Sequence, residues 1–467
     1  MNRRSRLSLS GLIFFSWMCL LKIPSQAAIL DVGTDYRLRG LSYSKVDYGV
    51  SSGQDYSYYS QRALAHIGGR FSPNIEFMTQ VQAIGVAGSS ASVTNPTVDP
   101  GMGRYPNTNF TPWVQWAYMK ATQLYDMPID LTVGRQPILL GDGLILSDDD
   151  LGFTGIRAQT RLPWYGLRAD LFTFKTGDAL QGARDADIYG IEFTKPLRAV
   201  RYQASWVMER DRSGNTLYIR PSENTSSALL SGSDFRATSI TRQFYDARIE
   251  GRLLQGGFYK FEGVLQTGHV DRSSATLGSV DIGGYAFLVS GGLFTRFSKY
   301  GPIEIHGTFG LASGDSGGGK DNSFRPSFGH RFDGLERSGF GEYYGASLYD
   351  ALPTTTYGPT GSTAAVSGLP PGYSGMRVIG AGVTTHPTNL LSIGIDYYVY
   401  TAQETPGSNF PVGSSESSLG TELDIGAGFA YTSYLTFRAS YAMFSPGKAY
   451  PNRDQATRLL IEAIGRF

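Results

Sequence analysis

The last ten residues, "RLLIEAIGRF" (458–467), alternate in side-chain character with a period of two. One parity is uncharged and ends in an aromatic residue: Leu459, Ile461, Ala463, Gly465 and Phe467. The other parity carries three charges, on Arg458, Glu462 and Arg466. Successive side chains of a β-strand point to opposite faces, and a tilted strand of about 9–11 residues crosses a bilayer. The segment therefore predicts a final membrane strand whose apolar face contacts lipid.

Residues 1–27 predict a secretory signal peptide, with an uncleaved anchor as the alternative. Three arginines within the first six residues precede an apolar run and a small-residue cleavage site before Ala28, which is the order of such peptides. The single cysteine, Cys19, lies inside this segment, so the mature chain, 28–467, is expected to lack disulfides. Cleavage removes four of 41 basic residues and none of the 40 acidic ones, which leaves a net charge of −3. This balance does not favour a nucleic-acid partner.

The composition of the rest of the chain favours a membrane β-barrel. No run of 18 apolar residues follows the signal segment, so no transmembrane helix is expected. Aromatic residues nevertheless make up 13% of the chain, and 59 of its 467 residues are glycine. A lipid-facing apolar surface, a polar lumen and aromatic belts at both interfaces account for this mixture. A large secreted β-sandwich or β-helix is the alternative, but it would not need an aromatic last strand.

The spacing of connections predicts 18 strands. Eight short connections, such as 72–74, 163–166 and 255–257, alternate with nine longer links rich in Gly, Ser, Asp, Asn and Thr. An even strand number with short periplasmic turns and long external loops is typical of outer-membrane barrels. The longest link, 315–373, is expected either to stand outside or to fold into the mouth. The expected strands are 29–43, 57–71, 75–88, 111–123, 128–141, 154–163, 166–176, 187–195, 199–211, 240–254, 257–272, 282–298, 303–314, 374–386, 389–403, 418–431, 435–445 and 457–467.

Three segments resemble the bacterial alginate export family. They are "WVQWAYMKATQLYDMPIDLTVGRQPILLGDGLIL" (113–146), "LASGDSGGGKDNSFRPSFGHRFDG" (311–334) and "LGTELDIGAGFAYTSYLTFRASYAMFSPG" (419–447). They match the family's Gly-Arg-Gln, Ser-Gly-Asp and Gly-x-Glu-x-Asp features in order. The resemblance implies a monomeric eighteen-stranded barrel in the outer membrane that passes an anionic polysaccharide outward. It also implies that Phe467 is read by the machinery that inserts barrels.

Arginine outnumbers lysine by 32 to 9, and many arginines fall on the predicted lumen parity. Rings of arginine favour anions, because each guanidinium can bind a carboxylate through two donors. The alternative is that arginines pair with acids on neighbouring strands and brace the wall. The candidate pore-lining residues on this parity are Arg37, Arg39, Arg62, Arg157, Arg161, Arg168, Asp170, Arg201, Arg248, Arg252, Glu422, Asp424 and Arg438.

Two hairpins of the predicted lumen differ in how their arginines are compensated. Arg248 and Arg252 alternate with Asp246 and Glu250 on one strand, so we expect these acids to neutralise them. The hairpin that holds Arg157, Arg161 and Arg168 has fewer acids, and we expect it to be the more positive surface. Arg161 and Arg168 flank a short turn, which places them at the periplasmic entrance.

Arg135 is a further pore candidate with an unusual position. It shares parity with Ile129, Leu131 and Val133, which are expected to face lipid, and a mid-membrane arginine there costs about 2–4 kcal/mol. We expect a bulge between Gly134 and Pro137 to turn Arg135 inward. The alternative is an interfacial position from which the side chain snorkels.

No cofactor is expected. Asp148–Asp150, Asp315 and Asp321 offer oxygen ligands of the kind that Ca²⁺ prefers, but a solvated loop is the simpler interpretation. A general porin for small solutes is the main alternative function. An outer-membrane enzyme would need a nucleophile beside a histidine and an orienting group. The sequence shows no such trio, so we do not expect an enzyme.

Overall fold

The computed structural model describes residues 29–45, 55–87, 111–148, 152–177, 185–214, 216, 218, 220–223, 236–253, 256–273, 278–295, 301–326, 328, 340–344, 369, 372–405, 416–450 and 453–467. The predicted signal peptide lies outside these ranges, and its cleavage stays a prediction. Helix within the described part is limited to three single 3-10 turns, η2 (Leu124–Asp126), η3 (Pro163–Tyr165) and η4 (Pro221–Glu223). None of the described helices is long and apolar enough to span a membrane.

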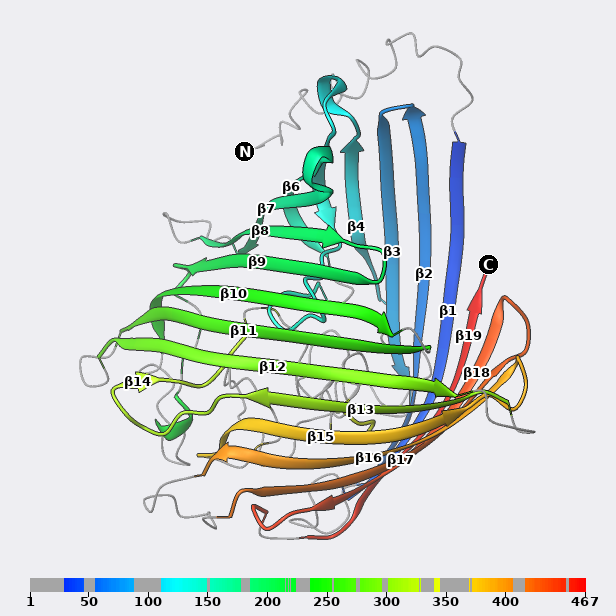
Figure 1. Ribbon diagram of the computed structural model, residues 1–467, viewed down its shortest axis with the longest axis vertical. Helices are drawn as coiled ribbons and strands as arrows, with labels where there is room; N and C mark the ends of the chain where they lie inside the picture. The colour runs from blue at the N-terminus through cyan, green and yellow to red at the C-terminus, as the bar shows by residue number, and fades with distance from the viewer. Residues whose placement is uncertain are drawn as a thin grey trace, which may run out of the picture.

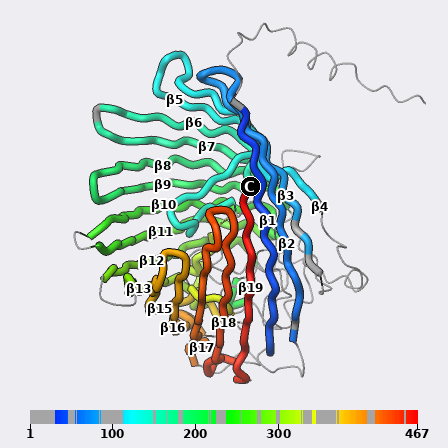
Figure 2. Tube along the Cα trace, turned by 90° about the vertical axis from the view of Figure 1, so that its right-hand side faces the viewer, coloured from blue at the N-terminus to red at the C-terminus, as the bar shows by residue number. Residues whose placement is uncertain are grey.

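Eighteen long antiparallel strands form one closed sheet (Figure 1). Each long strand pairs with its neighbour in the chain, and β1 also pairs with β19 from Asp35–Arg466 to Ser44–Thr457, which closes the barrel. Figure 2 shows these two strands side by side. The eighteen-stranded barrel is therefore confirmed. The strands are β1 (Ile29–Ser44), β2 (Tyr56–Ser72), β3 (Ile75–Ala87), β4 (Thr111–Ala121), β5 (Ile129–Gln136), β6 (Phe153–Leu162), β7 (Leu167–Gly177), β8 (Ala186–Pro196), β9 (Val200–Asp211), β10 (Ala237–Leu253), β11 (Gly257–Arg272), β12 (Val280–Thr295), β13 (Ile303–Ala312), β15 (Ser374–Thr385), β16 (Leu391–Glu404), β17 (Ser418–Ala430), β18 (Leu435–Pro446) and β19 (Ala456–Arg466).

The two faces of the wall follow the alternation in the sequence. Outward side chains such as Leu30, Tyr245 and Ile461 are exposed in the isolated chain, as lipid-facing residues of a barrel must be. Inward neighbours such as Asp246 and Glu462 are buried. At the closing seam, the Phe467 amide donates to the Thr34 carbonyl and the Thr34 amide donates to the Phe467 carbonyl, each at 2.8 Å. The terminal residue is therefore part of the seam, and its ring lies on the outside.

One predicted strand is too long. The sequence pattern extends from 128 to 141, but β5 ends at Gln136, because Pro137 has no amide hydrogen for the ladder. The chain then leaves the wall and enters the lumen. The apolar residues Ile138, Leu140 and Leu144 are buried there. A run that reads as the end of a strand is thus an inward segment, which we call segment A (137–148).

Segment A is held against the opposite wall by polar contacts. The Asp142 amide donates to Glu262 Oε2 at 2.8 Å, and Asp142 Oδ1 accepts from Lys260 and Arg248 at 2.9 Å each. Gly141 has φ +57°, and a Cβ there would lie 2.4 Å from Glu262 Oε1. Only glycine allows this approach without displacing the carboxylate.

The described parts of the longest link, between β13 and β15, also fold inward. The two-residue strand β14 (Lys320–Asp321) pairs in parallel with β12. Phe328 exchanges backbone hydrogen bonds with segment A, at Ser147 and Ile145. Further along, residues 340–344, which we call segment B, pack against β16 and β17. Of the two expected positions of this link, its described residues take the one inside the mouth.

The lumen differs between its two ends. Towards the long external links, segments A and B pack with inward apolar residues such as Val207, Phe244 and Phe444 in one buried cluster. Towards the short periplasmic turns, inward positions are mainly charged or polar. The functional candidates lie in this polar half and at the boundary between the halves.

Candidate functional site: the lumen arginines

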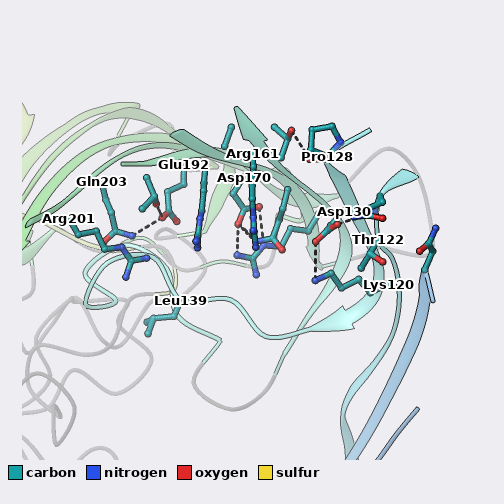
Figure 3. A pocket seen from close by; sticks show the side chains of 18 of the residues that line it. Lys120, Thr122, Pro128, Asp130, Leu139, Arg161, Asp170, Glu192, Arg201 and Gln203 are labelled. Atoms are coloured by element: carbon teal, nitrogen blue, oxygen red, sulfur yellow. Dashed lines mark hydrogen bonds and ion pairs between the residues drawn. The ribbon is translucent and has the colours of Figure 1, made fainter. Parts of the chain in front are cut away.

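A cavity of about 790 Å³ lies beside the periplasmic turns of β2–β9 (Figure 3). Its lining includes five basic and three acidic side chains, a net charge of +2, and Leu139 of segment A. Figure 3 shows Lys120, Arg161 and Arg201 arranged around this space. The charged residues are Lys120, Arg157, Arg161, Arg168, Arg201, Asp130, Asp170 and Glu192.

Arg161 and Arg168 face each other directly across β6 and β7. Both are exposed to the lumen, and within the described part of the chain neither guanidinium has an ion-pair partner. Like charges directly opposite on adjacent strands are destabilising. Their position at the periplasmic entrance agrees with the sequence prediction.

The other cavity arginines are compensated. Arg157 forms a two-donor ion pair with Asp170, in which Nε donates to Oδ2 at 2.8 Å. Arg201 lies 3.3 Å from Glu250 of β10, and Lys120 lies 3.3 Å from Asp130. Within the described residues, Arg161 and Arg168 are therefore the two cavity arginines without an ion pair, and the lining acid Glu192 accepts hydrogen bonds from Thr194 and Gln203. The β6–β7 hairpin is therefore the less compensated one, as the sequence predicted, but one of its three predicted arginines, Arg157, is neutralised by Asp170.

A second group of arginines spans the closing seam, and we call it the seam group. It comprises Arg37, Arg39, Arg62, Arg438 and Arg458, all on the inward face of β1, β2, β18 and β19. Arg39 and Arg438 both stand opposite Glu462, one on each side. Arg39 Nε donates to Glu462, and Arg37 Nε lies 3.9 Å from the same carboxylate. The sequence placed four of these residues in the lumen but did not predict that they meet.

Segment B supplies the acid that bridges the remaining two arginines. The carboxylate of Glu342 forms ion pairs with both Arg438 and Arg458. Arg458 also donates from Nη1 to the Glu342 carbonyl at 2.8 Å and from Nε to the Tyr43 hydroxyl at 3.0 Å. The side chain of Arg438 is 39% exposed, whereas that of Arg458 is 1% exposed. The bridge therefore joins a covered arginine to one that faces open lumen.

The family model for alginate export matches residues 28–351. The chain belongs to the alginate export family. The match covers more than half of the sequence and includes the Gly-Arg-Gln and Ser-Gly-Asp segments, so the resemblance is confirmed. No curated protein matches the sequence. The protein is an outer-membrane β-barrel of a family of channels, and the cell outer membrane is its location.

The solved structures that are similar to this protein are outer-membrane porins. OccK9 (OpdG) of Pseudomonas aeruginosa has a TM-score of 0.51 at 11% identity, covering 94% of this chain and 99% of that one. A BenF-like porin from Pseudomonas fluorescens Pf-5 gives the same values. OprD of Pseudomonas aeruginosa has a TM-score of 0.50 at 11% identity, covering 94% and 95%. At this identity the likeness shows the fold alone.

Two of the predicted pore-lining acids, Glu422 and Asp424, are covered by segment B. Glu422 is fully buried beneath segment B, where it accepts hydrogen bonds from the amides of Tyr343 at 2.6 Å and Tyr344 at 3.1 Å. The Glu342 amide donates to both Glu422 and Asp424, at 2.7 and 2.9 Å. Both acids point inward as predicted, but they anchor segment B and do not border open lumen.

Arg248 and Arg252 also differ from each other. Arg248 is buried and pairs with Asp142 at 2.9 Å and Glu250 at 2.7 Å, so it is neutralised as expected and secures segment A. Arg252 is exposed at the periplasmic end of β10. Within the described residues its side chain has no ion pair, so the expectation that Asp246 and Glu250 neutralise Arg252 is wrong; Glu250 pairs instead with Arg201 and Arg248.

The prediction that a bulge turns Arg135 inward is wrong. β5 keeps its register through Arg135, which stands opposite Ala117 of β4 and Thr154 of β6 on the outer parity. The bulge lies in β4, where the pairing skips Gln115. Its carbonyl accepts from Arg135 Nε at 3.1 Å, so the bulge supplies a partner for an outward arginine and does not reverse it.

The external aspartates are engaged by protein groups. Asp315 pairs with Arg220 at 2.9 Å, and Asp321 pairs with Arg325 at 3.0 Å. Both aspartates are buried, so the expectation of a solvated loop is wrong for them. Asp148 accepts from Trp116 Nε1 at 3.3 Å. Asp149 and Asp150 lie outside the described residues, and the Ca²⁺ alternative for them stays a prediction.

Three functional residues were missing from the sequence-based site. Asp142 directly follows the expected strand 128–141, and Glu342 lies in the link 315–373, which was expected either to stand outside or to fold into the mouth. Arg458 was placed on the polar face of the last strand but was not singled out. The apolar run 138–140 after Pro137 was the available signal for segment A, since an inward loop needs apolar residues to bury. Nothing in the local sequence of Glu342 indicates its two arginine partners.

Proposed function

We propose that this outer-membrane channel passes an anionic polysaccharide, such as an alginate-like polyuronate, and that Arg161 and Arg168 attract its carboxylates at the periplasmic entrance. The observation that carries the proposal is the direct opposition of these two arginines without an acid between them. Such a pair lowers stability unless an anion joins it. A guanidinium can donate two parallel hydrogen bonds to one carboxylate. The carboxylate of a uronate unit is therefore a chemically suitable partner for these two arginines.

The family match supports an anionic polysaccharide as the cargo, and the position of the cavity supports entry from the periplasm. The matched family is described by alginate export, and alginate is a polymer with one carboxylate per sugar. The cavity of about 790 Å³ opens on the side of the short turns, which face the periplasm in this class of barrel. An exported polymer therefore meets the uncompensated arginines first.

A channel for small solutes is the second candidate. Most charged groups of the cavity are paired across strands, for example Arg157 with Asp170 and Lys120 with Asp130. A wall of paired charges suits the diffusion of small polar solutes with little selectivity. The two candidates differ in how strongly the channel binds an oligouronate.

Planar-bilayer recordings with two matched variants test the proposal. Arg161→Gln with Arg168→Gln removes two positive charges, whereas Arg157→Gln with Asp170→Asn removes an ion pair and leaves the net charge unchanged. Reversal potentials in a salt gradient measure anion preference, and block by trigalacturonate, with neutral maltotriose as reference, measures carboxylate binding. We expect the first variant to lose both anion preference and block, most visibly below about 0.1 M salt, where the screening length exceeds about 10 Å. The second variant is expected to retain both.

Two results would count against this function. Equal block by trigalacturonate in the wild type and the Arg161→Gln, Arg168→Gln variant would remove these arginines from the site. Block of the wild type by neither sugar would favour the small-solute channel.

A further inference from the structure

We propose that Arg438 and Arg458 form a second carboxylate-binding site of the lumen, and that the protein's own Glu342 occupies it in place of a substrate carboxylate. The proposal rests on the proposed function, because it assumes that an anionic cargo enters the lumen. It adds a site further along the strands and a residue that competes for it.

The surroundings of Glu342 are those of a bound anion. Its carboxylate contacts two arginines from different strands, and Ser440 Oγ lies 3.5 Å from Oε2. Arg458 is oriented by the Tyr43 hydroxyl at 3.0 Å, and its guanidinium carbon lies 5.8 Å from the centre of the Tyr43 ring. A planar fork held in this way is ready to bind a carboxylate through two donors.

The acids that contact the seam group come from two different places. Glu462 of the wall contacts Arg39 and Arg37, whereas the acid that lies between Arg438 and Arg458 is Glu342. The second acid, Glu342, comes from a link and not from a strand. If Glu342 withdraws, Arg438 and Arg458 lose this acid, and a cargo carboxylate can replace it with no change in the number of charges.

The anchor of segment B does not depend on the Glu342 side chain. The backbone amides of Glu342, Tyr343 and Tyr344 donate to Glu422, and the Phe340 carbonyl accepts from the Tyr400 hydroxyl. Gly341, at φ +107°, allows the backbone to approach this point, because a Cβ would lie 2.3 Å from the Tyr400 oxygen. Changing the Glu342 carboxylate therefore tests the competing charge while segment B stays in place.

The experiment compares block by trigalacturonate in four proteins. Glu342→Gln keeps the side-chain length and removes the competing charge. Glu304→Gln is the matched control, because it removes another inward carboxylate, which lies 3.8 Å from His306 of β13. The fourth protein combines Glu342→Gln with Arg438→Gln. Heat-modified gel mobility confirms that each barrel has folded.

We expect the half-blocking concentration to fall by about tenfold in Glu342→Gln, the effect of losing roughly one charge-assisted competitor. It should be unchanged in Glu304→Gln and return to the wild-type value in the double variant. An unchanged value in Glu342→Gln, an equal gain in Glu304→Gln, or a gain that survives Arg438→Gln would each overturn the proposal. The entrance function is decided separately by Arg161 and Arg168, so block that depends on them but not on Glu342 leaves the proposed function standing alone.

Discussion

Replacing Glu422 with leucine should release segment B from the wall. Glu422 is fully buried and accepts from the amides of Tyr343 and Tyr344 at 2.6 and 3.1 Å. Leucine has a similar size but no acceptor. The Glu342 amide keeps a partner in Asp424 at 2.9 Å, and the Tyr400 hydroxyl keeps the Phe340 carbonyl. The backbone amides of Tyr343 and Tyr344 are therefore the two donors that lose their acceptor.

The magnitude follows from those two amides. A buried donor left without an acceptor costs about 1–3 kcal/mol, so the docked state of segment B should lose about 2–6 kcal/mol. Since about 1.4 kcal/mol is a factor of ten, the ratio of docked to undocked segment should fall by at least about thirtyfold. The barrel wall itself should remain intact, because no strand–strand hydrogen bond is changed.

Hydrogen exchange in detergent micelles measures this directly. A peptic peptide that contains residues 340–344 should be protected in the wild type and should exchange at least about thirtyfold faster in Glu422→Leu. Peptides from β10 and β11 should not change. Glu192→Leu is the matched control, because Glu192 accepts from Thr194 and Gln203 on the wall and from no amide of segment B.

The reasoning would be refuted by unchanged exchange of the 340–344 peptide in a folded Glu422→Leu barrel. It would also be refuted if Glu192→Leu released the segment equally, because the effect would then reflect the loss of any lumen carboxylate.

Two further predictions concern the external links and the chain terminus. Burial opposes ionisation of Asp315, but hydrogen bonds from Arg220 and Ser222 outweigh it and hold the pKa of Asp315 below its usual 3.8. A carboxyl with a lowered pKa stabilises the folded link above its unfolded pKa, and the contribution is lost as pH falls through the lower folded value. The Gly317 amide donates to Asp315 at 3.2 Å, so its hydrogen exchange should rise below about pH 4, beyond the intrinsic effect of pH on exchange. The Asp315→Asn variant should show high exchange at every pH, without this transition. A flat pH profile in the wild type would contradict the assignment. Deletion of Phe467 should lower the amount of barrel in outer-membrane fractions, because it removes two seam hydrogen bonds and the expected assembly signal, and normal levels would show that neither matters for assembly.

The sequence predicts the wall well because lipid and lumen impose opposite requirements on alternate residues. Strand number, hairpin order and the inward parity of Arg37, Arg157 and Arg248 all follow from a period of two. The entrance position of Arg161 and Arg168 follows from their distance to a short turn. These features depend on local sequence and on the bilayer, so the alternation predicts them without knowledge of distant contacts.

Features that depend on distant contacts were missed. The sequence shows that Glu422 and Asp424 face inward, but not that segment B covers them. Arg135 keeps the outer parity that the alternation gives it, and its partner, the Gln115 carbonyl, is created by a bulge in another strand. The pairing of Glu342 with Arg438 and Arg458 joins a link to strands about 100 residues later. Such pairings are set by how the links fold back into the finished barrel.

The place of the seam group has a consequence for the order of folding. Arg39 and Glu462 are 423 positions apart in the chain, and contacts of such long sequence separation form late because the chain must first close a very long loop. Until β1 meets β19, both strands also present unpaired edges that lipid does not tolerate. The pairing of β1 with β19 satisfies the backbone groups of both edges. The same step brings Arg37 and Arg39 beside Arg438 and Arg458. A chain that stalls before closure has no assembled seam group, so a leaky, half-assembled barrel would also lack this anion site.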